Sequence, residues 1–173
     1  MDSAGHDKKS ISQNAVVFVV CMLFFWCCEQ GLSPETAVQQ LPPYGIKGVV
    51  YFKNWPPADS IRDLRLAALK NSPSSDVINE ILQGRARYTE TLVPYGADSI
   101  VYQLILTPLA TGIFPYVAVA QQFGPNLQKD WRVVGVYYKG GDTTMPGAVD
   151  VPADSIVPMI NISVDFLHLP PQP

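Results

Sequence analysis

The chain has few of the residues on which catalytic and metal sites most often depend. Its three cysteines are Cys21, Cys27 and Cys28, and its two histidines are His6 and His168. Residues 29–173 therefore have no disulfide, thiol nucleophile or cysteine-bound zinc, and one histidine is too few for a typical catalytic zinc site. No G-x-S-x-G elbow or phosphate-binding glycine loop occurs either. We expect no catalytic residue, metal site, cofactor or enzymatic activity.

Charge is also scarce. Charged residues make up 16% of the 173 positions, and 12 basic against 15 acidic residues leave a net charge of −3. Without a basic excess the protein lacks the electrostatic means to bind nucleic acid, so we expect no nucleic-acid partner. A hydrophobic content of 47% with so small a net charge indicates a folded domain rather than a disordered chain.

A long membrane-spanning run is missing as well. The apolar stretch at residues 15–28 is fourteen residues long, whereas a spanning helix needs about 20. Lys8 and Lys9 lie in the polar segment before it. A positive segment followed by a short apolar core is the layout of a secretory signal. No small-residue cleavage site closes the run, which ends at Cys27 and Cys28.

A hydrophobic segment that ends at a cysteine resembles the signal of bacterial lipoproteins. The resemblance implies that Cys28 is acylated and becomes the first mature residue, because the small Cys27 precedes it. Cys27 is the alternative, although it follows the bulky Trp26. The implied location is the cell envelope, with the membrane bound through an N-terminal lipid anchor. An ordinary signal peptide of a secreted protein and a short uncleaved anchor remain open.

The composition changes along the chain and suggests four parts. Residues 1–28 form the signal segment, 29–44 a polar tether, 45–169 the folded domain and 170–173 a tail. Sixteen prolines and twelve glycines divide the domain at short intervals, which favours short strands over long helices.

Alternation of apolar and polar residues predicts about seven short strands. We place them at 46–53, 61–70, 85–92, 100–107, 116–122, 132–138 and 156–166. One short helix is predicted at 76–83, with Gly84 as the residue that ends it. Short alternating strands between turns predict an all-β fold, an antiparallel sandwich with one inserted helix.

Three of these segments carry a resemblance to a known fold. They are Ile46–Phe52 (IKGVVYF), Gly112–Ala120 (GIFPYVAVA) and Ile160–Phe166 (INISVDF). Their order resembles the prealbumin-like sandwich of carboxypeptidase-regulatory-type domains. The resemblance implies an immunoglobulin-like or prealbumin-like fold and a non-catalytic module in an envelope or secreted protein. The chain departs from that family by its helix at 76–83 and by lacking an Asp-Gly turn before an aromatic strand residue.

The most distinctive loop is Phe123–Trp131 (FGPNLQKDW). Sugar rings stack on flat aromatic faces, so Trp131 with Gln122, Asn126 and Arg132 nearby is a candidate ligand site. Packing of Trp131 in the core is the alternative for that residue. Two functions remain open: an accessory role in which the tethered domain contacts another envelope protein, and carbohydrate binding through this loop.

Overall fold

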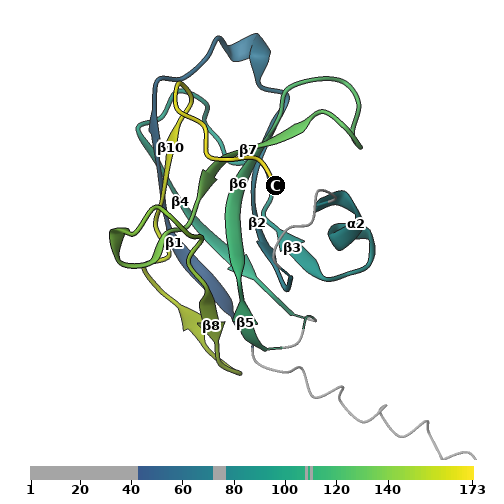
Figure 1. Ribbon diagram of the computed structural model, residues 1–173, viewed down its shortest axis with the longest axis vertical. Helices are drawn as coiled ribbons and strands as arrows, with labels where there is room; N and C mark the ends of the chain where they lie inside the picture. The colour runs from purple at the N-terminus through teal and green to yellow at the C-terminus, as the bar shows by residue number, and fades with distance from the viewer. Residues whose placement is uncertain (1–42, 72–76, 108, 110) are drawn as a thin grey trace, which may run out of the picture. The chain divides into compact units, whose positions relative to one another are not determined.

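The computed structural model describes residues 43–71, 77–107, 109 and 111–173. They belong to the second of two compact units, Leu41–Pro173, and form an all-β fold (Figure 1). The strands are β1 Gly45–Lys53, β2 Asp63–Leu69, β3 Ala86–Tyr88, β4 Ser99–Ile105, β5 Gly112–Phe114, β6 Tyr116–Gln122, β7 Trp131–Val136, β8 Val149–Val151, β9 Ile156–Val157 and β10 Ile162–Asp165. The helix α2 spans Val77–Leu82, and two 3₁₀ turns span Ala58–Ser60 and Lys139–Gly141. The candidate lipidation residues Cys27 and Cys28, and residues 29–42 of the predicted tether, lie outside the described residues.

The strands form two main sheets. One has the order β3-β2-β6-β7 and is antiparallel throughout. The other has the order β10-β1-β4, with β9 also paired to β1. A third, two-stranded sheet joins β5 and β8.

The predicted antiparallel pairing is wrong for part of the second sheet. β1 pairs antiparallel with β4, but β9 and β10 both pair with β1 in parallel. Alternation along a strand records which face is buried and carries no information about the direction of the neighbouring strand, so the sequence pattern could not reveal this. We name the two sheets the antiparallel sheet and the mixed sheet.

The main core lies between these two sheets, which cross one another in Figure 1. Alternate residues of each strand turn toward it, as predicted for β1, where Ile46, Val50 and Phe52 are buried. Tyr44, assigned to the tether from the sequence, is buried in the same core, and its carbonyl accepts a hydrogen bond from Leu106 N. The folded domain therefore begins before Gly45.

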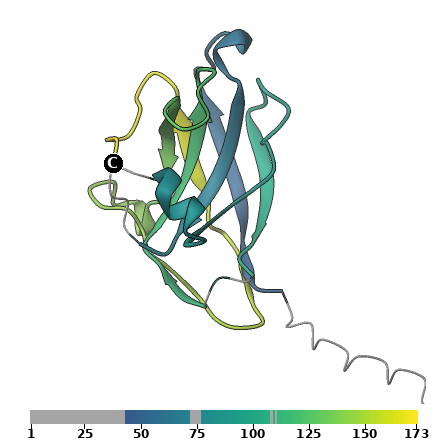
Figure 2. The same ribbon diagram turned by 90° about the vertical axis from the view of Figure 1, so that its right-hand side faces the viewer.

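The two sheets approach most closely where β7 packs against β10. A Cβ atom on Gly135 would lie 2.7 Å from Val164 Cγ2 and 3.0 Å from Ile162 Cγ2, so only glycine fits there without movement. A bulge interrupts the β6–β7 pairing between Val119 and Ala120 and bends β7 locally. On the other side of the mixed sheet, no further strand among the described residues pairs with β4, and Figure 2 shows β4 as the teal strand at the right-hand edge.

The predicted segment 156–166 is the one that differs most from the structure. It contains two short strands, β9 and β10, separated by an irregular stretch in which Met159 has a φ of 61°. Pro158 cannot donate a ladder hydrogen bond, and Met159 leaves the extended conformation directly after it. The segment nevertheless stays beside β1, because Ile160 N donates to Lys47 O between the two paired stretches.

Candidate functional site

The outer face of the antiparallel sheet differs between its two ends. At one end Ile81 of α2 packs on a small apolar cluster that includes Leu69, Ala86 and Tyr116. At the other end no helix covers the strands within the described residues. Strand register places the side chains of Asp63 and Arg65 there, opposite Gln122 and Ala120 of β6.

A groove of about 560 Å³ lies on this open end. Its floor consists of small or branched residues, Ala67, Ala120 and Val133, one from each of three neighbouring strands. A groove of this volume is within the range of small-molecule sites in proteins, which is roughly 300–1,000 Å³. The short alanine side chains create the depth, because the flanking side chains rise higher above the sheet.

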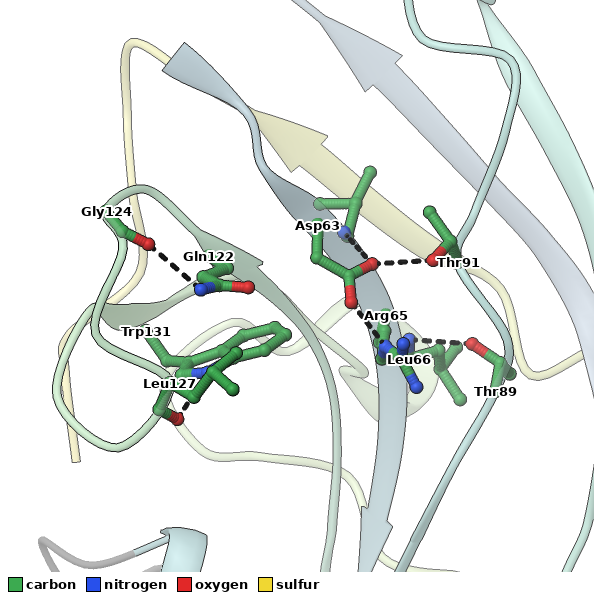
Figure 3. Close-up of polar contacts among 10 residues, drawn as sticks. Asp63, Arg65, Leu66, Thr89, Thr91, Gln122, Gly124, Leu127 and Trp131 are labelled. Carbon is green, nitrogen blue, oxygen red and sulfur yellow. Dashed lines mark hydrogen bonds and ion pairs between the residues drawn. The ribbon is translucent and has the colours of Figure 1, made fainter. Parts of the chain in front are cut away.

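One wall of the groove is a polar network centred on Asp63 (Figure 3). Asp63 Oδ2 pairs with Arg65 Nε at 2.6 Å, and Asp63 Oδ1 accepts hydrogen bonds from Leu64 N and Thr91 Oγ1, both at 2.8 Å. The guanidinium of Arg65 lies 5.2 Å from the centre of the Tyr88 ring, a cation–π distance. These contacts hold Arg65 in one place on the wall.

The opposite wall is built by the loop before β7. Trp131 Nε1 donates to Leu127 O at 3.0 Å, which fixes the indole ring, and the side chains of Leu127 and Gln128 line the groove beside it. Figure 3 shows Trp131 on one side and Arg65 with Asp63 on the other. An aromatic wall therefore faces a charged, hydrogen-bonded wall across an alanine floor.

No family model, curated protein or solved structure matches this chain. The functional argument therefore depends on the geometry of the groove.

The loop that carries Trp131 is held by its own side chains. Asn126 Oδ1 accepts hydrogen bonds from Gln128 N at 2.9 Å and Lys129 N at 3.2 Å, and Asp130 Oδ2 accepts one from Asn126 N at 2.8 Å. Gln122 is buried, and its Nε2 donates to Gly124 O at 2.9 Å. Asn126 and Gln122 therefore hold the loop in shape.

Of the residues selected from the sequence, the structure brings Trp131 and Arg132 to the groove. The Arg132 side chain is partly engaged elsewhere, since its Nε donates to Gln121 Oε1 at 2.9 Å and its guanidinium lies 5.6 Å from the centre of the Phe123 ring. Trp131 is therefore the better placed of the two for ligand contact.

The sequence analysis did not select Asp63, Arg65, Tyr88 or Gln172, although all four line the groove. Charged residues at alternate positions of a strand, such as Asp63 and Arg65, look like any solvated sheet face. One usable signal was the alanines Ala67, Ala118 and Ala120 on neighbouring strands, because small residues at alternate strand positions can leave a hollow.

The end of the chain contributes to the same site. Gln172 lines the groove, and its side-chain amide bonds both backbone groups of Val133: Oε1 accepts from Val133 N at 2.9 Å, and Nε2 donates to Val133 O at 3.0 Å. The predicted tail at 170–173 is thus bound to the outer edge of β7 at this position, as Figure 1 also shows near the C-terminus.

His168, the one histidine in residues 29–173, is not among the residues that line the groove. Its Nδ1 is 3.0 Å from Asp165 Oδ2, and its side chain is 80% exposed. Hydrogen bonds from Asn54 Nδ2 and His168 lower the pKa of Asp165 to about 2. Leu167 N also donates to Asp165 Oδ1, so this carboxylate organises the turn after β10.

The part of the chain that the structure describes contains no group of three or more side chains that could hold a metal ion. It also contains no helix that is long and apolar enough to cross a membrane.

Proposed function

We propose that the folded domain is a non-catalytic binding module and that its ligand is a carbohydrate held in the groove of the antiparallel sheet. The observation that carries this proposal is the pairing of a fixed indole with a fixed charged wall. A sugar ring has an apolar face that stacks on an aromatic ring and a rim of hydroxyl groups that need hydrogen-bond partners. The Trp131 wall suits the face of the ring, and the Asp63–Arg65 wall suits the rim.

Preorganisation supports the same ligand class. Trp131 Nε1 is bonded to Leu127 O, and Asp63 is bonded to Arg65 and Thr91 before any ligand arrives. Side chains that are already ordered lose little conformational entropy when a ligand binds. Weakly bound hydrophilic ligands such as sugars depend on this, because displaced water offsets most of their hydrogen bonding.

Binding without hydrolysis is the activity that we propose. Glycoside hydrolysis needs a pair of carboxyl groups on either side of the scissile bond. Among the described residues that line the groove, Asp63 has the one acidic side chain, and Arg65, Thr91 and Leu64 N already engage it. A residue held as an ion pair in this way suits ligand positioning better than proton transfer.

The experiment is a glycan array followed by calorimetric titration of the best glycan, with Trp131→Ala as the test variant. We expect Trp131→Ala to weaken binding about fivefold or more, since loss of one stacking ring removes about 1 kcal/mol or more. Tyr51→Ala is the matched control, because Tyr51 is an aromatic residue 46% exposed outside the groove. Equal affinity of wild type and Trp131→Ala, or equal loss in both variants, would contradict the proposal.

We also propose a fold class for the domain. The two packed sheets and their common core support an immunoglobulin-like or prealbumin-like sandwich, the class that the resemblance implies. The parallel pairing of β1 with β9 and β10 distinguishes this chain from a purely antiparallel member of that class.

For the location, we propose a lipoprotein tethered to the membrane of a bacterial cell envelope through Cys28, with Cys27 as the alternative. Support comes from the apolar run at 15–28 that ends at these cysteines. In this setting the ligand is an envelope glycan, and the alternative partner is another envelope protein.

The test of the tether is the intact mass and N-terminal residue of the protein recovered from membranes of its native host. We expect a lipid-modified chain that begins at Cys28, and we expect the Cys28→Ser variant to lack this modified species. An unmodified chain cleaved elsewhere would make the protein a secreted module and would overturn the tether. The groove proposal is independent of this outcome.

A further inference from the structure

The edge of the mixed sheet at β4 has unpaired backbone groups. Phe52 N donates to Asp98 O and Leu106 N donates to Tyr44 O, one at each end of the β1–β4 pairing. In an antiparallel pair the residues that bond the neighbour alternate with residues that face away. The even-numbered residues of β4 therefore bond β1, and Ser99, Val101, Gln103 and Ile105 direct their N–H and C=O groups outward. Within the described part of the chain these four residues bond no other strand.

The other three edges of the main sheets are protected. β3 is only three residues long. β7 carries a bulge, and the amide of Gln172 occupies both backbone groups of Val133. β10 packs against β7 at Gly135. Short length, bulges and covering segments are the devices by which proteins block unwanted strand pairing.

Within the residues that the structure describes, β4 has none of these devices. It is seven residues long, and its sequence SIVYQLI contains no charge, proline or glycine. Uncharged β-forming segments of this length are those that pair most readily with another strand. Figure 2 shows the strand at the margin of the sheet, where an added strand would continue it.

The surface beside this edge combines exposed apolar side chains with the polar residues Lys47, Gln103 and Asn161. Val101 is 80% exposed and Met159 is 77% exposed, and Tyr51 lies on the neighbouring strand. Val101 and Met159 line a shallow depression together with Val49, the residue paired with Val101. When a strand is added at the edge, its side chains lie beside these residues and shield part of their apolar surface from water.

We infer that β4 pairs antiparallel with β4 of a second copy of this chain, with the two-fold axis beside Tyr102. This register places Val101 opposite Gln103 of the second copy and Ser99 opposite Ile105. All four outward-facing residues then exchange both backbone groups, which no other symmetric register achieves. Tyr102 stays out of the contact, because its side chain is buried and its hydroxyl donates to Ile160 O at 2.6 Å.

A second copy suits this edge because the strand is complementary to itself. β4 contains no charge, so two copies bring no like charges together across the pair. Asp98 comes just before the strand and lies opposite Leu106 of the second copy in this register. The two Asp98 residues therefore lie at opposite ends of the β4–β4 pair. The pair would join two mixed sheets into one continuous sheet and would leave both grooves free.

The test is sedimentation equilibrium of the full chain in detergent over a wide concentration range, comparing Gln103→Pro with Gln103→Ala. Proline removes the outward N–H of Gln103, which β1 does not use, and alanine retains it. We expect a concentration-dependent dimer for wild type and Gln103→Ala, with dissociation constants within about threefold of each other. Gln103→Pro should weaken the dimer at least tenfold. All variants keep residues 1–42, so association through that segment is the same in each.

A second pair of variants tests the same edge without proline, in case the proline variant misfolds. Val101→Lys places a charge on an exposed side chain at the edge, and Val101→Thr is its uncharged control. Val101→Lys should also weaken the dimer at least tenfold, with unchanged circular dichroism and urea midpoint. A monomeric wild type, or equal dimer affinity in wild type, Gln103→Pro and Val101→Lys, would overturn the inference.

Discussion

The outer faces of the two sheets differ in the segments that cover them. On the antiparallel sheet, the loop before β7, Gln172 and Ile81 of α2 line a groove that has one aromatic and one charged wall. On the mixed sheet the outer face has an exposed apolar surface that includes Val101 and Tyr51. Both faces consist of alternate strand residues, so the strands alone do not make a site. The connecting segments give the outer face of the antiparallel sheet its depth. No such segment covers the described part of the mixed sheet, and its edge at β4 stays open to pairing.

The two sides of β2 give the sharpest test of this comparison and the largest expected effect. Leu66 is fully buried in the core, whereas Arg65 faces the groove. Leu66→Ala should lower the free energy of unfolding by about 2–5 kcal/mol, because it leaves a cavity. Arg65→Ala should cost about 1 kcal/mol or less, as expected for a partly exposed ion pair, but should weaken glycan binding.

Urea unfolding followed by tryptophan fluorescence measures both variants. A similar loss of stability in the two would mean that the groove wall is part of the structural core, and the distinction between the two sides of the sheet would fail.

The contact between the sheets predicts an intermediate effect. Gly135→Ala should destabilise the protein by about 1–3 kcal/mol, because the new methyl group would overlap Val164 Cγ2. Val164→Ala removes that methyl group. The double variant should therefore be more stable than the sum of the two single changes predicts, and urea midpoints provide the measurement. Strict additivity would show that the sheets do not meet at this point.

The turn after β10 predicts the smallest effect, a gain in stability that is lost in acid. The pKa of Asp165 is lowered to about 2 from its ordinary value of 3.8, first by the Asn54 hydrogen bond. A carboxyl group whose pKa falls on folding stabilises the fold above its unfolded pKa, and that stability is lost as the pH falls through the folded pKa. The difference in melting temperature between wild type and Asp165→Asn should shrink from pH 5 to pH 2. A constant difference over this window would contradict the assignment.

Much of the antiparallel sheet could be predicted from sequence. The alternation in 61–70 and 116–122 predicted β2 and β6, and the predicted helix at 76–83 corresponds to α2, followed by Gly84 with a φ of 69°. These elements are long enough for several alternations, and each has a clear ending residue. The three-residue strands β5 and β8 are too short to show a period, and the sequence analysis missed β8.

Less of the groove could be predicted from the sequence. Trp131 was selected because its loop has an unusual composition, and it lies on one wall. The other wall combines Asp63, Arg65 and Tyr88 from β2 and β3, and Gln172 comes from the far end of the chain. Their proximity depends on strand pairing over long sequence separations, which composition and spacing do not encode.

The parallel pairing within the mixed sheet has a consequence for synthesis on the ribosome. β1 emerges early, but Val50 pairs with Ile162, more than one hundred residues later. Until that stretch has been translated, β1 can pair only with β4, and the core side chains of both strands lack part of their cover. Contacts between distant segments form slowly, and uncovered strands aggregate readily while they wait. We expect chains that stop before β9 to aggregate or be degraded, whereas the chain that includes β9 and β10 can complete its mixed sheet.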